Sequence, residues 1–187
     1  MGPRRLQDHE SARGRQVPPR RVPRGLEARG VEAPPVRRAE REIKDRAEID
    51  AILARAPVVR IAMVDGGEPY VVPMHFGYEG GRIVCHSAAG GRKIAVLRRN
   101  PRVCFEATVD EAVAIGSIGC KSSATYRCVM GAGTVRFIED RAEKIRALDA
   151  LMRKFAPGPF SYAEDDLART AVFEIVIESV SGKKAGS

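Results

Sequence analysis

Hydrophobic and polar residues follow the period of β-strands over most of the chain after residue 42. Apolar and β-branched residues gather in short stretches that are bounded by glycine, proline or acidic residues, a pattern typical of strands joined by tight turns. The predicted strands are Val58–Val64, Pro69–Phe76, Arg82–His86, Val103–Val109, Thr125–Ile138 and Ala171–Ser181. Residues 65–67 and 78–81 have turn chemistry, so we expect the first three strands to form an antiparallel meander.

Three other stretches repeat apolar residues with the period of a helix. Residues 45–48 and 140–143 have the spacing of a capping box, in which an aspartate caps the helix and a glutamate reaches back. A third helix is expected between Gly90-Gly91 and Asn100-Pro101, and a short fourth one at 163–169. The residues expected to face inward from the first three helices are Ile49, Ile52, Leu53, Ile94, Leu97, Ile145, Leu148, Leu151, Met152 and Phe155.

Six strands with mainly hairpin connections predict a mainly-β domain with peripheral helices, built as a small barrel. A doubly wound sheet is excluded because no helix separates the first three strands. Gly131-Ala132-Gly133 predicts a bulge or bend, as barrel closure requires. Pro73 lacks a backbone donor and predicts a sheet edge or an irregular point. Residues 110–124 are expected to form a loop.

Composition separates an arm from this domain. The chain has 187 residues and a formal net charge of +8, and residues 1–41 hold 11 arginines, 5 acidic residues and 6 of the 12 prolines. We expect residues 1–41 to be a disordered basic arm and residues 42–187 to be the folded domain. The arm either binds RNA, DNA or an acidic surface or has no role.

Several classes of protein are excluded by what the sequence lacks. No run of 18 apolar residues and no secretory signal occur, so we expect a cytoplasmic protein without a membrane span. The cysteines at positions 85, 104, 120 and 128 lack the paired spacing of a zinc site, so no metal site is expected. Cys85 and Cys104 lie in apolar runs and are expected to be buried, reduced thiols.

The segment from Ser87 to Lys93 offers chemistry for binding a phosphate. Two glycines precede a helix whose first amides are free, and Ser87, Arg92 and Lys93 surround that helix start. The segment is not a P-loop, because the glycine and lysine spacing differs. A simple turn with solvated basic side chains is the alternative interpretation.

Two further segments carry candidate side chains. His75 follows the irregular point at Pro73, and His86 ends the next strand; either histidine is a functional group or a half-buried structural residue. Tyr126 and Arg127 could bind an aromatic or anionic ligand, or they could simply alternate between the two faces of a strand.

Taken together, these segments resemble a known family. The motifs are Pro69–Tyr78, Gly81–Ile83, His86–Ala88, Gly91–Lys93, Leu97–Pro101, Val103–Phe105, Tyr126–Val129, Gly131, Gly133 and Ser181–Lys183. Their order and spacing over residues 40–184 look like the pyridoxamine 5′-phosphate oxidase-like flavin-binding split barrels, in particular the nitroimidazole-resistance branch.

The resemblance implies a homodimer of six-stranded, Greek-key-like split β-barrels with FMN at the dimer interface. It places the backbone of Val71, Val72, Pro73 and Met74 along the flavin, and Ser87, Arg92 and Lys93 around its phosphate. His86 is also expected to bind the cofactor. It places His75 near the ring face as the candidate catalytic residue, and Tyr126 and Arg127 in the site, from either subunit. The implied function is an FMN-dependent oxidoreductase that uses a reduced electron donor to reduce small soluble molecules such as nitroaromatics.

Some points stay open. Relatives often carry a tryptophan before the Tyr-Arg segment, and residues 119–123 lack one. This difference affects what the resemblance implies about the substrate more than what it implies about the cofactor. Relatives also begin near the position of Val36, so residues 1–35 are expected to precede the true start. The alternatives are a non-catalytic flavin- or haem-binding protein with His75 or His86 as the axial ligand, a deazaflavin enzyme, and a nucleic-acid-binding protein that acts through its arm.

Overall fold

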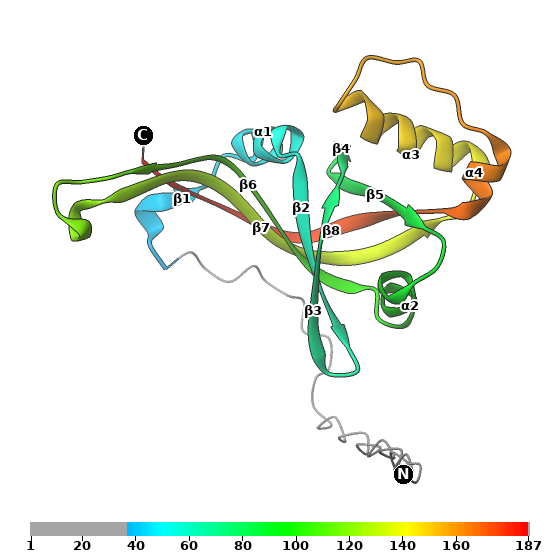
Figure 1. Ribbon diagram of the computed structural model, residues 1–187, viewed down its shortest axis with the longest axis horizontal. Helices are drawn as coiled ribbons and strands as arrows, with labels where there is room; N and C mark the ends of the chain where they lie inside the picture. Colours follow the sequence, from blue (N-terminus) through cyan, green and yellow to red (C-terminus); the bar gives the residue numbers. More distant parts are fainter. Residues whose placement is uncertain (1–36, 187) are drawn as a thin grey trace, which may run out of the picture. The chain divides into compact units, whose positions relative to one another are not determined.

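The computed structural model describes residues 37–186, which form an antiparallel sheet with helices around it (Figure 1). The strands are β1 (Glu42–Ile43), β2 (Val58–Asp65), β3 (Glu68–His75), β4 (Gly77–Glu79), β5 (Arg82–Ala88), β6 (Arg102–Ala114), β7 (Ser123–Ile138) and β8 (Thr170–Ala185). The helices are α1 (Arg46–Arg55), α2 (Arg92–Arg99), α3 (Arg141–Arg153) and α4 (Glu164–Arg169), with 3₁₀ turns at Ala39–Arg41 and Gly119–Lys121. The mainly-β class with peripheral helices is confirmed, with two short strands, β1 and β4, beyond the six that were predicted.

The order of the strands shows how the sheet closes. The neighbours are β3-β2-β6-β7-β8-β5-β4, with β1 added beside β8. Strands β3 and β4 therefore lie at opposite ends of this order, yet Phe76 is the single residue between them. The two ends of the sheet must meet in space at Phe76, which is fully buried. The sheet thus curls into a barrel that is joined covalently at this point but is not hydrogen-bonded across it.

This closure corrects the predicted meander. Strands β2 and β3 form a hairpin from Val58↔His75 to Asp65↔Glu68, but β5 pairs with β4 and β8 and not with β3. The predicted edge at Pro73 is confirmed, because β3 pairs with β2 alone. Pro69 and Pro73 supply no N–H group, so the free side of β3 cannot form a regular ladder with β5.

Two bulges shape the long strands. The predicted irregularity in β7 is confirmed, since its register against β8 shifts between Ala132 and Gly133. A second shift, in β6, falls between Val109 and Ala112, where Asp110 adopts a left-handed φ of 58°. The predicted loop at 110–124 is wrong for most of its length, because β6 and β7 continue past this bulge as a hairpin that projects from one end of the molecule (Figure 1).

The helices begin much as predicted. Asp140 accepts a hydrogen bond from the Glu143 amide at 2.8 Å, as in a capping box. Asp45 caps α1 by accepting from the Ala47 amide at 2.9 Å. Glu48 was predicted to reach back to the start of the helix, and this is wrong. Its carboxylate pairs instead with Lys184 Nζ at 3.1 Å.

One buried cluster fills the barrel and includes inward residues of β2, β5, β6 and β8 with α1 and α2. The largest fully buried side chains are Phe76, Phe173, Ile52, Leu53, Ile61, Ile83, Leu97 and Ile175. Phe155 was expected to face inward from α3 but is 48% exposed, because the helix ends at Arg153. Cys85 is buried as predicted, whereas the prediction for Cys104 is wrong. Its alternating position in β6 turns the thiol to the outer face of the sheet.

The predicted arm, residues 1–41, lies outside the described residues except for Arg37–Arg41, which include the first 3₁₀ turn. The arm, its proposed nucleic-acid role and the proposed start near Val36 stay predictions. Within residues 37–186, no helix is both long enough and apolar enough to cross a membrane.

Candidate functional site

The start of α2 is the candidate anion cradle of this structure. Strand β5 ends at Ala88, and the chain reaches the helix through Gly91, whose φ of 103° is left-handed. No side chain caps the helix, and the first intrahelical bond is donated by the Ala95 amide to the Gly91 carbonyl. The amides of the first turn therefore lack an intrahelical acceptor and carry the positive end of the helix dipole. Arg92 and Lys93 add two positive side chains to the same turn.

Asp65 holds Arg92 in position. The carboxylate, at the β2–β3 turn, accepts from Arg92 Nε at 2.8 Å and from an Arg99 Nη at 2.7 Å. The Arg92 guanidinium also lies 4.4 Å from the centre of the Tyr70 ring. Two arginines on one aspartate leave a net positive charge. Since Asp65 uses the Nε atom of Arg92, the two Nη groups remain available to a ligand.

His86 and Ser87 come shortly before this cradle in the chain. Both belong to β5, opposite Val172 and Ala171 of β8. Partial burial of the ring lowers the pKa of His86, and the positive charge of Lys93 lowers it further. His86 is therefore a neutral imidazole beside a cationic side chain at neutral pH. Burial raises the pKa of the neighbouring Cys85 to about 12, so its thiol stays protonated.

Strand β3 presents an open edge beside the cradle. The contact of Arg92 with Tyr70 brings the start of α2 to the first half of this strand. Within Val71–Met74, Val71 is 60% exposed and Met74 is 8% exposed, and Val72 packs partly against the core. Val71 and Pro73 thus face outward while Val72 and Met74 face inward. The backbone groups on the free side of β3 have no partner strand.

His75 lies at the far end of β3. It is five residues from Tyr70, or about 17 Å of strand. Its Nδ1 is 3.1 Å from the Pro57 carbonyl oxygen, which fixes the ring with Nδ1–H as the donor. The ring also meets Phe155 edge-on, with 5.4 Å between centroids. The exposed imidazole therefore keeps its Nε2 atom free to accept a hydrogen bond or to bind a ligand.

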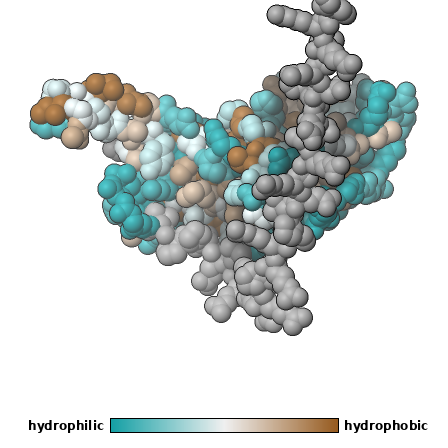
Figure 2. Space-filling model, turned by 60° about the horizontal axis from the view of Figure 1, so that its bottom comes forward, coloured by the Kyte–Doolittle hydropathy of each residue, from teal (hydrophilic) through white to brown (hydrophobic). Residues whose placement is uncertain are grey.

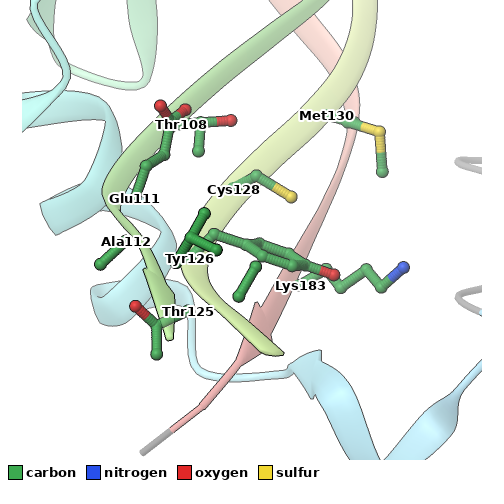
Figure 3. Close-up of a pocket in the computed structure, with 10 residues that line it drawn as sticks. Thr108, Glu111, Ala112, Thr125, Tyr126, Cys128, Met130 and Lys183 are labelled. Atoms are coloured by element: carbon green, nitrogen blue, oxygen red, sulfur yellow. The ribbon is translucent and has the colours of Figure 1, made fainter. Parts of the chain in front are cut away.

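Tyr126 and Arg127 lie apart from the cradle and on opposite faces of β7. Tyr126 faces the outer hollow shown in Figure 3, whereas Arg127 turns toward α1 and pairs with Asp110 at 3.2 Å and Glu48 at 3.4 Å. Ser87 pairs with Ala171 at one end of β8, and Tyr126 pairs with Ala185 at the other. Fourteen residues of strand separate these positions, about 45 Å. A single chain does not bring Tyr126 to the cradle.

The outer face of the sheet carries two adjoining hollows. One, of about 640 Å³, lies over β6, β7 and the end of β8 and includes Tyr126, Cys128 and Lys183. In Figure 3 the Tyr126 ring extends alongside Lys183, below Cys128 and Met130. The other, of about 480 Å³, lies over Val71, Ala62 and Cys104. Met130 borders both hollows, so they form one continuous and mostly apolar surface.

Sequence reasoning missed Asp65 and Arg99 as parts of the cradle. The spacing could have indicated Arg99, because Arg92 and Arg99 are two helical turns apart and share a face. It also missed the outer surface, although alternation in β2, β6 and β7 assigns Ala62, Cys104 and Met130 to one face.

Comparison with known proteins shows the family of the chain. The family model described as pyridoxamine 5′-phosphate oxidase matches residues 45–184, which is most of the chain. The chain belongs to this family. A curated protein of Rhizobium meliloti, itself uncharacterized, is 31% identical over 64 residues; the match covers 34% of this chain and 42% of that protein.

Solved structures place this family member among split barrels. A candidate 5-nitroimidazole antibiotic resistance protein of Bacteroides thetaiotaomicron is 34% identical over 76% of this chain and 86% of its own, with a TM-score of 0.70. An FAD and heme binding protein of Mycobacterium smegmatis is 25% identical, covering 79% of this chain and 74% of its own, with a TM-score of 0.71. The flavocytochrome Anf3 of Azotobacter vinelandii is 25% identical, covering 84% and 77%, with a TM-score of 0.73. The predicted split β-barrel is confirmed.

Proposed function

We propose that the protein is an FMN-dependent reductase of small molecules, with nitroaromatic compounds as the substrate class. The observation that carries this proposal is the uncapped start of α2, flanked by Arg92 and Lys93 and placed against the open edge of β3. Family membership and the likeness to the Bacteroides protein support it.

The residues present fit the phosphate of a flavin mononucleotide. A phosphate dianion would accept from the free amides of the first turn of α2 and from the Arg92 Nη groups, with Lys93 and Ser87 alongside. Gly90 and Gly91 would have no atom within 4 Å of an added Cβ, so the backbone there is open to a ligand. The free backbone groups of Val71–Met74 would lie along the flavin ring and ribityl chain.

The proposed active unit is a homodimer. Tyr126 and Ser87 pair with residues at opposite ends of β8, so one chain cannot place both at one ligand. In a two-fold dimer with antiparallel strands, the Tyr126 end of one copy lies beside the α2 end of the other. We infer that Tyr126 is supplied by the partner subunit. The ion pairs of Arg127 with Glu48 and Asp110 make it a support for the hairpin base.

The chemistry divides between cofactor and protein. When bound, the flavin would transfer electrons from a reduced donor to the substrate. The protein would hold the phosphate at α2, exclude water with the apolar outer surface, and place His75 at the edge of the site. With Nδ1 fixed by the Pro57 carbonyl, His75 Nε2 is the atom that would exchange a proton with the substrate.

A second candidate is a haem-binding protein, alone or with a flavin. The Mycobacterium smegmatis and Azotobacter vinelandii structures are described as an FAD and heme binding protein and a flavocytochrome. The observation that favours this candidate is the free Nε2 of His75, since a histidine ring nitrogen is a common axial ligand of haem iron. His86 is the alternative ligand, because its lowered pKa keeps it neutral.

The test begins with the ligand that the purified protein carries. An absorption spectrum distinguishes flavin from haem, and mass spectrometry of the ligand released on denaturation distinguishes FMN, FAD and deazaflavin. The FMN-loaded protein is then assayed for reduction of a nitroimidazole with a nicotinamide donor. FMN with measurable turnover supports the proposal. A Soret band lost in His75→Ala would support the second candidate, and the absence of both ligands after reconstitution would refute both.

A further inference from the structure

A further cavity, of about 410 Å³, lies between α3 and the strands β4, β5 and β8. Figure 1 shows α3 beside β4 and β5. None of the residues used in the flavin proposal lines this cavity. The exposed apolar residues Val113, Ile115 and Ile118 also lie elsewhere, at the tip of the β6–β7 hairpin (Figure 2). The cavity under α3 is therefore distinct from the candidate flavin site and from the exposed apolar surface.

One side of this cavity holds a network of paired charges. Glu174 is only 4% exposed, and its carboxylate accepts from Arg136 Nε at 2.8 Å and lies 3.4 Å from an Nη of Arg82. Arg136 also donates to both carboxylate oxygens of Glu143. Glu79 lines the cavity as well and pairs with an arginine of α3 at 3.1 Å. Each acidic group at the cavity is thus paired with an arginine, which leaves no free carboxylate for a cationic ligand.

Arg146 adds a positive charge that no acidic group balances. It extends from α3, lines the cavity, and forms no ion pair and no side-chain hydrogen bond within residues 37–186. The hydrogen bonds of Arg136 lower the pKa of Glu143, and the charges of Arg146 and Arg82 lower it further, so these two guanidinium groups lie near the same carboxylate. Three arginines and two glutamates make up the network with Glu174, which therefore carries a net charge of +1.

The rest of the cavity is apolar. Val84 of β5 is 6% exposed, and Ala147 and Ala150 of α3 are each 8% exposed. Val84 and Ala147 belong to a small buried cluster between α3 and the sheet, separate from the core of the barrel. The two alanines are too small to fill the space beside the arginines. Apolar walls with a few convergent polar groups are the usual construction of a site for a small ligand.

We propose that this cavity binds a small organic carboxylate between Arg82 and Arg146. The apolar part of that ligand packs against Val84, Ala147 and Ala150. A guanidinium group donates two parallel hydrogen bonds to a carboxylate, and Arg146 has its donors free for this purpose. Arg82 has a single ion-pair contact, at 3.4 Å, and keeps further donors for the ligand. Because the site shares no residue with the flavin proposal, it stands or falls independently of that proposal.

The probe is benzoate, with benzylamine and benzamide as ligands of similar size that are cationic and neutral. Each is titrated by calorimetry into the full chain, with whatever cofactor the protein retains on purification. Benzoate should bind saturably at one site per chain, and the other two should bind at least about 10-fold more weakly, because they lack the charge-assisted contacts. Inorganic phosphate at the same concentration should not displace benzoate. Equal binding of the three aromatic ligands, binding that does not saturate, or displacement by phosphate would overturn the assignment of a carboxylate site.

Matched variants locate the binding. Arg146→Gln should weaken benzoate binding about 10- to 100-fold, since one charge-assisted contact is lost. Arg169→Gln removes the same charge from an exposed pair with Asp166 and should bind benzoate as the wild type does. Arg92→Ala/Lys93→Ala should also keep benzoate binding, which separates this site from the cradle. Unchanged affinity in Arg146→Gln, or loss of affinity in either of the other two variants, would overturn the proposal.

A second substitution tests the opposite side of the cavity. Arg82→Gln should weaken benzoate binding in the same way as Arg146→Gln, because the ligand lies between the two arginines. Addition of benzoate should raise the melting temperature of the wild type, and this increase should be smaller in both variants. An equal increase in all three proteins would show that benzoate binds elsewhere and would refute the site.

Discussion

Arg92→Ala/Lys93→Ala tests the phosphate cradle directly. A charge-assisted hydrogen bond to a phosphate is worth about 1.5–3 kcal/mol, so two of them give roughly 3–6 kcal/mol. The Arg92 side chain is 60% exposed and shares Asp65 with Arg99, and water screens such a contact. We therefore take the lower end, about 3 kcal/mol, which corresponds to about 100-fold weaker FMN binding at 1.4 kcal/mol per tenfold change.

The assay compares two ligands that differ only in the phosphate. FMN and riboflavin are titrated into the apo forms of the wild type and the variant, and binding is followed by quenching of flavin fluorescence. Riboflavin affinity should be nearly equal in both proteins, because it has no phosphate to lose. Arg98→Ala/Arg141→Ala removes the same charge from exposed side chains that pair with Glu139 and Glu164, and serves as the control.

The fold should tolerate the change. Both substituted residues lie outside the inward face of α2, where Ile94, Val96 and Leu97 are buried. Equal FMN affinity in the variant and the wild type would refute the phosphate site. An equal loss for FMN and riboflavin would mean that the variant perturbs the ring site and that the charge argument is wrong.

Three further predictions follow from individual residues. His75→Ala should retain FMN and change the turnover of a nitroaromatic substrate, measured by steady-state kinetics; unchanged turnover with several acceptors would remove His75 from the mechanism. Gly133→Ala should lower the melting temperature strongly, because the added Cβ would lie 2.3 Å from the Val176 carbonyl oxygen. The overpacking should cost at least about 1–3 kcal/mol of stability. Gly90→Ala is the control and should be neutral, because its added Cβ has no atom within 4 Å. Burial lowers the pKa of Lys154 to about 8 from 10.5. Between these two pH values the unfolded chain binds more protons than the folded one. The contribution of this group to the free energy of unfolding of the wild type should therefore increase as pH rises from about 8 to 10.5. Urea unfolding of Lys154→Met across this range should lack that contribution, and identical pH profiles would contradict the assignment.

The strands and helices were predictable from local periodicity, but the choice of strand partners was not. The alternation in β2, β3, β5 and β8 is visible in the sequence because each strand buries one face. Closure through Phe76 decides that β5 pairs with β8 and leaves β3 at an edge, and this depends on residues that are far apart in the chain. The bulge at Asp110 interrupts the alternation of β6, and for this reason a loop was predicted where a hairpin continues.

In the candidate site, too, local features were predictable and long-range arrangements were not. Arg92 and Lys93 could be found because a helix start is a local feature, and the spacing of Arg99 carried a signal that was overlooked. Tyr126 and Arg127 are consecutive in a strand, so the period of two alone separates them onto opposite faces. No local pattern reveals that Ser87 and Tyr126 pair with opposite ends of β8, because this depends on the register of β5 against β8 and of β7 against β8.

The prolines of β3 have a consequence for how the protein behaves in a crowded solution. A sheet edge with free amides is a template on which other chains can add as strands, and this is a common route to aggregation. Pro69 and Pro73 remove two of the donors that such an added strand would need. The protein can therefore leave backbone carbonyls and the remaining amides of β3 uncovered for a small ligand while discouraging a foreign strand from docking there.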